Sequence, residues 1–248
     1  NMIRNYLATL EYDGTKYNGW QKQGNTENTI QGKLETLLSR LLEQDIEVNG
    51  AGRTDKGVHA LGQRASFRCD TSLSPRELMA KVNEFLPRDI AIKSLEPVPP
   101  RFHARLNARG KTYRYTLIIN GEKSVFSGNY AWSMTEAPDI GLMKAAAHHL
   151  LGEHDFLPFS DLKKSKKSTI RRIDDIDIKK DGNRITIDFT GNGFLYHMVR
   201  RMVSALTDAG LGKLAPAQLG EALTYGSGSF LPLPAPARGL FLLDIYYK

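Results

Sequence analysis

The first hundred residues alternate between hydrophobic and polar positions in a pattern that predicts six elements of secondary structure. A period of two indicates strands, whereas apolar residues at helical spacing from Ile30 to Leu42 indicate an amphipathic helix. Ser74 and Glu77 form a capping box that begins a second helix. The predicted order is strand, helix, strand, strand, helix, strand, at residues 3–13, 30–42, 46–50, 63–69, 75–86 and 90–95.

The rest of the chain repeats this order. The segment KTYRYTLII places Tyr113, Tyr115 and Leu117 on one face of a strand. Asp181-Gly182 is a hairpin turn signal between two further strands. After that hairpin in the sequence, apolar residues at helical spacing predict a long helix. The predicted strands lie at residues 111–119, 173–180, 184–190 and 239–247, the helices at 139–151 and 195–206, and an additional short helix at 216–224.

Two successive units of this kind predict an α+β fold. We expect two consecutive ferredoxin-like (βαββαβ) halves with joined antiparallel sheets and a central basic cleft. The N-terminal α+β half is expected over residues 1–105 and the C-terminal α+β half over 106–248. The alternative is two ordinary α/β domains without common ancestry, since the halves share little residue identity.

The composition adds expectations about partners and location. A formal net charge of +7 favours polyanions such as nucleic acid, because released counterions drive association. No apolar stretch approaches the roughly 20 residues that span a bilayer, and no secretion signal precedes the first strand, so we expect a cytoplasmic protein without a membrane partner. The lone Cys69 is expected to be a buried strand thiol without a chemical role.

The most unusual local sequence runs from Gly50 to Ala60 in the N-terminal half, where three glycines flank Arg53 and Asp55 between two predicted strands. A loop held by a rigid scaffold is free to carry function, so Asp55 is a candidate for chemistry. The alternative is structural, since an Asp in a glycine-rich loop often only forms a turn with nearby backbone.

The segment GRTDKGVHA resembles the signature of the tRNA pseudouridine synthase I family, whose central Asp is the essential catalytic residue. Two positions depart from the commonest family pattern, Lys56 and Arg64, and they bear on substrate range more than on reaction type. Further segments resemble the family in the family's order: YDGTKYNGWQKQ, ENTIQGKLE, FHARLNARGKTYRY, GEHDFLPFS, GNGFLYHMVRRMV and PAPARGLFL.

The resemblance implies an isomerase that converts uridine to pseudouridine at positions 38–40 of tRNA, in the anticodon stem-loop, and that works as a homodimer. The reaction consumes no water and oxidises nothing, so we expect no cofactor and no metal, and the sequence has neither a phosphate-binding glycine loop nor a metal-spaced His and Cys cluster. It requires an ionised carboxylate that adds to the base, traps the ribose or assists departure of the base.

The resemblance also assigns roles to three residues around Asp55. Arg200 is the candidate ion-pair partner that keeps the carboxylate ionised, Arg53 is expected to contact RNA, and Tyr113 is expected to stack on the everted base. Without the resemblance, Arg200 would be interpreted as part of a solvated helix face and Tyr113 as part of the core. His59 and His103 lie in family segments but receive no role.

A run of basic residues is expected to contact tRNA phosphates without reading bases. A merely solvated loop is the alternative. The residues are Lys163, Lys164, Lys166, Lys167 and Arg171, with Arg172 beside them.

Two other functions fit part of this pattern. One is a catalytically silent tRNA-binding or tRNA-folding protein, against which the presence of Arg53, Asp55, Tyr113 and Arg200 together speaks. The other is a pseudouridine synthase paralogue with another RNA target.

Overall fold

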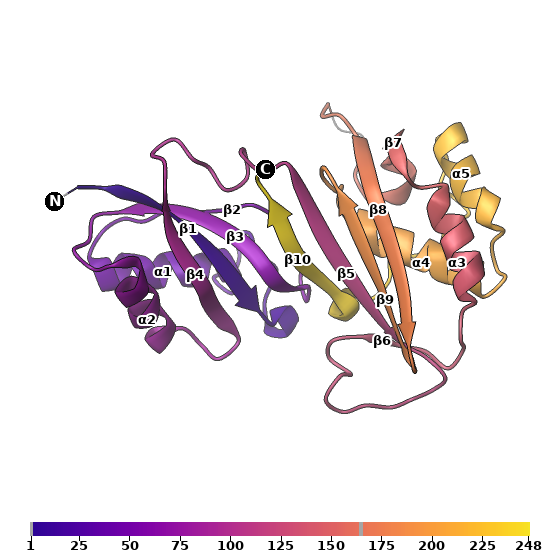
Figure 1. Cartoon of the computed structure of the whole chain (residues 1–248), viewed down its shortest axis with the longest axis horizontal. Coiled ribbons are helices and arrows are strands. Elements are labelled where there is room, and N and C mark those ends of the chain that lie inside the picture. The colour runs from indigo at the N-terminus through magenta and orange to yellow at the C-terminus, as the bar shows by residue number, and fades with distance from the viewer. Residues whose placement is uncertain (1, 164–165) are drawn as a thin grey trace. The chain divides into compact units, whose positions relative to one another are not determined.

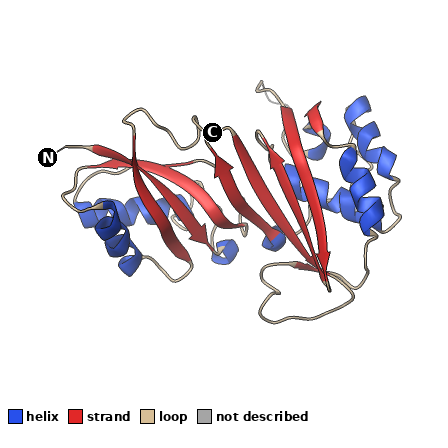
Figure 2. Ribbon diagram, viewed as in Figure 1, coloured by secondary structure: helices blue, strands red, loops and turns tan. Residues whose placement is uncertain are grey.

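A computed structural model describes residues 2–163 and 166–248 and shows a mixed α+β protein with two compact units (Figures 1 and 2). Unit 1 comprises Asn1–Arg109 together with Phe241–Lys248, and unit 2 comprises Gly110–Leu240. The sequence-based boundary between 105 and 106 lies close to the first of these limits. The last eight residues group with the N-terminal unit.

Unit 1 is a sheet with two helices. Its strand order is β4-β1-β3-β2, and every one of these pairs is antiparallel. The first two residues of β3, His59 and Ala60, which β2 does not reach, pair in parallel with the C-terminal strand β10. The elements are β1 (Arg4–Tyr12), α1 (Ile30–Leu42), β2 (Val48–Gly50), β3 (His59–Cys69), α2 (Pro75–Phe85), β4 (Ile90–Val98) and β10 (Leu240–Tyr246).

Local signals explain where the helices of unit 1 begin. The Thr29 side chain accepts a hydrogen bond from the Gly32 amide and caps α1. Both bonds of the Ser74–Glu77 capping box are present at α2. The two helices contact each other, and they pack their apolar faces against β2 and β4. The predicted helix positions in this unit are therefore confirmed.

Unit 2 contains the remaining strands and three α-helices. Its strand order is β5-β9-β8-β7 in antiparallel pairs, and the short β6 adds to β5 in parallel. Helix α3 contacts α4, α5 and β8. The elements are β5 (Gly110–Ile118), β6 (Trp132–Ser133), α3 (Ile140–His148), β7 (Gly152–Asp155), β8 (Ile170–Asp181), β9 (Arg184–Gly191), α4 (Met198–Gly210) and α5 (Pro216–Tyr225).

Three short 3-10 helices complete the description of the two units. They are η1 (Gly14–Lys16), η2 (Leu157–Phe159) and η3 (Ala237–Gly239).

Several predicted bounds were wrong. Strand β3 begins at His59 rather than at 63, because the turn that precedes it closes at Gly57, which has a φ of 81°. Helix α4 begins at Met198 rather than at Leu195, because His197 adopts the left-handed conformation with a φ of 60°. The two-residue β6 and four-residue β7 were not predicted.

None of the helices in the described ranges is long and apolar enough to pass through a lipid bilayer. The Cys69 thiol is buried in β3, as predicted.

Candidate active site

Asp55 lies in the loop that joins β2 to β3, where side chains alternate between the interior and the surface. Thr54 is buried, and its hydroxyl lies 2.7 Å from the hydroxyl of Tyr12. Burial raises the pKa of Tyr12, so this hydroxyl stays neutral. Arg53 and Lys56, on either side, are exposed, and Asp55 itself is partly exposed. The loop therefore presents its charged side chains outward from a fixed backbone.

The buried amide of Gln63 fixes the start of this loop. Its oxygen accepts a hydrogen bond from the Gly52 amide (3.1 Å), and its nitrogen donates to the Gly52 carbonyl (2.6 Å). Gln63 is completely buried, so breaking either bond would leave a polar group without water. The side chain of Gln63 on β3 thus satisfies the two backbone groups of Gly52 that a neighbouring strand would otherwise bind.

The segment between β1 and α1 packs closely against the other side of the same loop. The Trp20 amide donates to the Thr54 carbonyl (3.0 Å), and the Gly14 amide donates to Nδ1 of His59 (2.9 Å). A Cβ on Gly19, which has a φ of 86°, would lie 2.6 Å from the Thr54 carbonyl oxygen. Two sequence segments singled out above, YDGTKYNGWQKQ and GRTDKGVHA, therefore form one packed structure.

Arg64, one of the two departures from the family pattern, has structural partners in unit 1. Its guanidinium forms an ion pair with Glu96 on β4 (3.0 Å) and lies over the ring of Tyr247, 5.5 Å from its centroid. Lys56, the other departure, is exposed.

In unit 2, Tyr113 lies on β5 opposite Phe189 of β9. Its ring is only 7% exposed and meets Phe194 edge to face, with centroids 5.1 Å apart. The side chain is thus held firmly within its unit.

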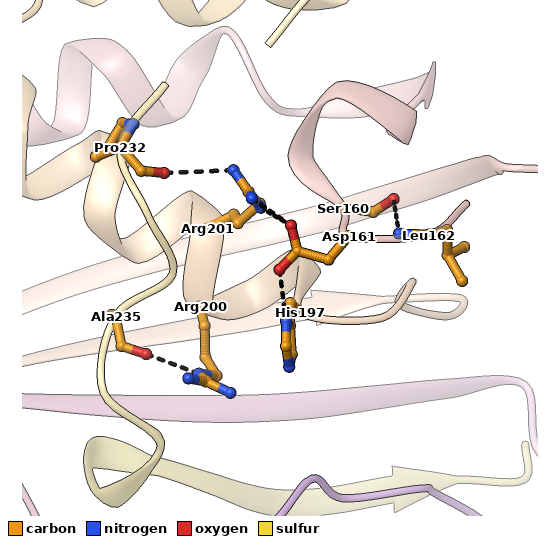
Figure 3. Close-up of polar contacts among 8 residues, drawn as sticks. All are labelled: Ser160, Asp161, Leu162, His197, Arg200, Arg201, Pro232 and Ala235. Carbon is orange, nitrogen blue, oxygen red and sulfur yellow. Dashed lines mark hydrogen bonds and ion pairs between the residues drawn. The ribbon is translucent and has the colours of Figure 1, made fainter. Parts of the chain in front are cut away.

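Arg200 projects from the first turn of α4 and is tied to the segment 232–235 (Figure 3). Its Nε donates to the Ala235 carbonyl (2.7 Å), and the Ala235 amide donates back to the Arg200 carbonyl (3.0 Å). The first bond orients the plane of the guanidinium, because Nε is part of that plane, and the second holds the Arg200 backbone against the same segment. The Arg200 head is therefore oriented by the Ala235 carbonyl.

The network beside Arg200 was not predicted (Figure 3). One oxygen of Asp161 accepts hydrogen bonds from Nε (2.7 Å) and Nη2 of Arg201, and the other lies 2.6 Å from Nδ1 of His197. Burial raises the pKa of the Asp161 carboxyl, but the hydrogen bonds from His197 and Arg201 outweigh burial and hold the pKa below its ordinary value. An ionised Asp161 thus joins the loop before β8 to the start of α4.

This network stabilises an otherwise unfavourable helix start. His197 is the N-cap of α4 in a left-handed conformation, and its side chain makes no capping bond to the helix. The Tyr196 ring stacks on the imidazole at 3.7 Å between centroids and remains 48% exposed. Both residues lie in the segment GNGFLYHMVRRMV, but their partner Asp161 is distant in sequence, and no local pattern reveals that pairing.

The predicted basic run is only partly described. Lys163, Lys166 and Lys167 are exposed, and Lys164 lies outside the described residues. Arg171 donates to the carbonyls of Ser168 and Ile170, so its guanidinium already has backbone acceptors. No cluster of potential metal ligands occurs in residues 2–163 and 166–248.

A family profile described as tRNA pseudouridine synthase matches residues 8–107 and 146–248. The match covers most of the chain and includes the Asp55 loop, the Asp161 network and Arg200, whereas Tyr113 lies between the two matched ranges. The chain belongs to the tRNA pseudouridine synthase family. The predicted family and the predicted class of enzyme, an isomerase that forms pseudouridine in tRNA, are thereby confirmed.

Individual members of the tRNA pseudouridine synthase family match the chain over its whole length. The tRNA pseudouridine synthase A 2 of Bacillus cereus is 39% identical over 245 residues, which are 99% of this chain and 100% of that protein. The tRNA pseudouridine synthase A 1 of Clostridium tetani is 43% identical over 245 residues, with the same coverage.

A solved structure of an H/ACA RNP bound to a substrate RNA containing 2'-deoxyuridine is a much weaker match. It is 10% identical, covers 95% of this chain and 46% of that chain, and has a TM-score of 0.36. A score this low does not establish a common fold.

Proposed function

We propose that this protein isomerises uridine to pseudouridine at positions 38–40 of the tRNA anticodon stem-loop, with Asp55 as the catalytic carboxylate. The observation that carries the proposal is the construction of the Asp55 loop. Buried hydrogen bonds join Tyr12 to the Thr54 side chain and Gln63 to the Gly52 backbone and hold the loop in place, while Asp55 stays partly exposed. A reacting group needs this combination of accessibility and fixed position.

The reaction sets the chemical requirements. The bond between ribose C1′ and uracil N1 breaks, the base turns, C1′ joins C5, the proton on C5 leaves, and N1 gains a proton. Atoms and electrons balance without an oxidant. An ionised carboxylate serves this sequence either by covalent attack or by assisting departure of the base.

Three further residues are proposed to take part. Arg200 supplies the positive charge that keeps the carboxylate of Asp55 ionised, and Tyr113 stacks on the base during eversion. Arg53 contacts the RNA beside the everted nucleotide. What supports these roles is the fixed orientation of Arg200 by Ala235 and the rigid setting of Tyr113 against Phe194.

Features of the assembly belong to the same proposal. The strand order β4-β1-β3-β2 of unit 1 is that of a ferredoxin-like unit, which supports the proposed pair of ferredoxin-like halves, and a central basic cleft is proposed with them. A homodimer and a cytoplasmic location are proposed with it. The exposed lysines near residue 163 are proposed to contact tRNA phosphates.

One experiment tests the proposed reaction and its position. An unmodified tRNA transcript is incubated with the protein, treated with carbodiimide and mapped by primer extension. We expect stops that correspond to positions 38–40, in transcripts with uridine there and not in transcripts with cytidine. Stops elsewhere would contradict the position, and a transcript without any stop would contradict the reaction.

A further inference from the structure

Unit 1 contains a polar pocket of about 180 Å³ next to the Asp55 loop. Its lining includes Trp20, Gly50, Arg53, His103 and Arg105, together with amide side chains. Arg53 comes from the loop itself, and the other two basic residues come from the FHAR segment after β4. The pocket lining includes no carboxylate.

The two arginines of this pocket have unused hydrogen-bonding capacity. Among the residues that the structure describes, neither the Arg53 nor the Arg105 guanidinium has a hydrogen-bond acceptor or an ion-pair partner. Both side chains are exposed to solvent. Two guanidiniums that line one small pocket repel each other unless an anion joins them, and each offers a planar fork of donors that fits phosphate oxygens.

His103 adds a third donor with a defined direction. Its Nδ1 accepts hydrogen bonds from the backbone amides of Arg105 (3.1 Å) and Leu106 (3.3 Å). The proton of the neutral ring therefore resides on Nε2, which donates. The imidazole thus offers Nε2 as a donor.

The backbone that carries these groups is braced. The Ala104 amide donates to the Ser66 hydroxyl (3.0 Å), and the Ala104 carbonyl accepts from the Tyr247 hydroxyl (2.7 Å). On the other wall, the Trp20 ring lies so close to Gly50 that a Cβ there would be 2.3 Å from it. Such bracing reduces the entropy lost when a ligand binds.

We infer that this pocket binds a phosphate group of the RNA backbone, held by Arg53, His103 and Arg105. The inference rests on the proposed function, since it takes the same tRNA as the source of the phosphate. The pocket volume is several times the roughly 30 Å³ that a water molecule occupies in the liquid, so a phosphate group can enter. Because Arg53 is two residues from Asp55 in sequence, the bound phosphate belongs to a nucleotide near the target uridine.

Substitution of Arg105 tests the inference through tRNA binding. The dissociation constant of an unmodified transcript is measured at several KCl concentrations for the wild type, Arg105→Ala, Arg105→Lys and Arg76→Ala, the last being an exposed arginine outside the pocket. We expect Arg105→Ala to bind about tenfold more weakly, with a salt slope smaller by about 1. Arg105→Lys keeps the slope, and Arg76→Ala matches the wild type.

A second measurement identifies the phosphate. Single uncharged methylphosphonate linkages are placed along an anticodon stem-loop RNA, and binding to wild type and Arg105→Ala is compared. We expect one methylphosphonate linkage near the target uridine to weaken RNA binding by the wild type. The same linkage should cause no further loss of binding by Arg105→Ala. If every linkage weakened both proteins equally, or if Arg105→Ala bound as the wild type does, the inference would be overturned.

The outcomes separate this inference from the proposed function. If the wild type forms pseudouridine and Arg105→Ala binds tRNA as tightly as the wild type, the phosphate pocket is contradicted and the proposed reaction is supported. If Arg105→Ala binds tRNA more weakly but the wild type forms no pseudouridine, the proposed reaction is contradicted and the RNA-binding pocket is supported.

Discussion

At the scale of single residues, the Asp55 loop depends on a few buried polar groups that replace regular strand pairing. Thr54 and Gln63 are buried in unit 1: Gln63 holds the backbone of Gly52, before Arg53, and Thr54, between Arg53 and Asp55, binds the Tyr12 hydroxyl. Gly14 and Gly19 allow the neighbouring segment to approach within a distance that a Cβ would prevent. The chemistry is thus supported by residues that never touch a substrate.

Replacing Thr54 with Val removes one of these anchors. The Tyr12 hydroxyl would lose its partner in a buried environment, so we expect the free energy of unfolding to fall by about 1 to 3 kcal/mol in urea denaturation. Adding Tyr12→Phe should recover part of this loss, because both polar groups are then absent. A Thr54→Val protein as stable as the wild type would show that the hydrogen bond contributes nothing.

Tyr113 offers a test of base stacking at the same scale. Loss of the ring in Tyr113→Ala should reduce pseudouridine formation by the equivalent of about 1 to 3 kcal/mol. Tyr113→Phe keeps the ring and its contact with Phe194, so it should retain stacking. Single-turnover rates of the two variants, with melting curves for each, make the comparison. Equal rates for Tyr113→Ala and the wild type would contradict base stacking and would mean that the Tyr113 ring only packs within its unit.

At the scale of elements, the start of α4 is held by long-range contacts rather than by a local cap. Asp161 binds His197 and Arg201, and Arg201 also reaches the Pro232 carbonyl (3.4 Å). His197 and Arg201, which flank Arg200 in the sequence, are thereby fixed to the segments that contain Asp161 and Pro232 (Figure 3). We infer that helix α4 depends on this carboxylate for its first turn.

The lowered pKa of Asp161 predicts a pH dependence. Because the folded pKa lies below the unfolded one, the stabilisation is complete above the unfolded pKa, about 3.9, and is lost as the pH falls through the folded value. Asp161→Asn should lower the free energy of unfolding at neutral pH by about 1.5 to 3 kcal/mol and flatten its decline in acid.

Denaturation between pH 2 and 7 measures this effect, with Asp175→Asn as the control, since Asp175 is exposed on β8. The control should follow the wild-type curve. If the stability of Asp161→Asn followed the wild-type curve as well, the Asp161 network would contribute nothing to the free energy of unfolding.

Elements that depend on neighbouring residues could be predicted from sequence, and those that depend on distant partners could not. The Ser74 capping box and the Asp181-Gly182 turn are local, and both were placed correctly. The two residues of β6 are too few for any periodicity. The left-handed His197 is stabilised by Asp161 from another part of the chain, so the helix start was predicted too early.

The same distinction applies to the candidate site. Asp55, Arg53, Tyr113 and Arg200 were singled out through motifs, each of which is a local pattern. His103 and Arg105 lie in one of the quoted segments, yet their association with Arg53 appears only when the pocket is formed.

At the scale of the whole molecule, the C-terminal segment groups with the N-terminal unit. The segment Phe241–Lys248 belongs to unit 1, where the centroid of the Phe241 ring lies 4.8 Å from that of the His59 ring and the Tyr247 hydroxyl donates to the Ala104 carbonyl. The C-terminus therefore braces both the start of β3 and the FHAR segment. The positive net charge of the chain acts on tRNA at this scale too.

Charge from the basic run should be visible in the salt dependence of tRNA binding. Replacing Lys163, Lys164, Lys166 and Lys167 with Ala is expected to weaken binding and to reduce the salt slope, by about 0.7 to 0.9 for each lost phosphate contact. Replacing the exposed Lys33 and Lys81 of unit 1 is the control and should leave the slope unchanged. A wild-type slope in the fourfold variant would mean that these lysines are only solvated.

The central claim is that the carboxylate of Asp55 performs the chemistry, and proton release measures it most directly. Isomerisation frees the hydrogen on C5, so tRNA labelled with tritium at C5 of uridine releases tritium to water at the rate of the reaction. We predict that Asp55→Asn lowers the single-turnover rate by about 10⁴-fold or more while its tRNA dissociation constant stays close to that of the wild type, and that Asp45→Asn, an exposed control, is unaffected. Tritium release by Asp55→Asn at the wild-type rate would contradict the account.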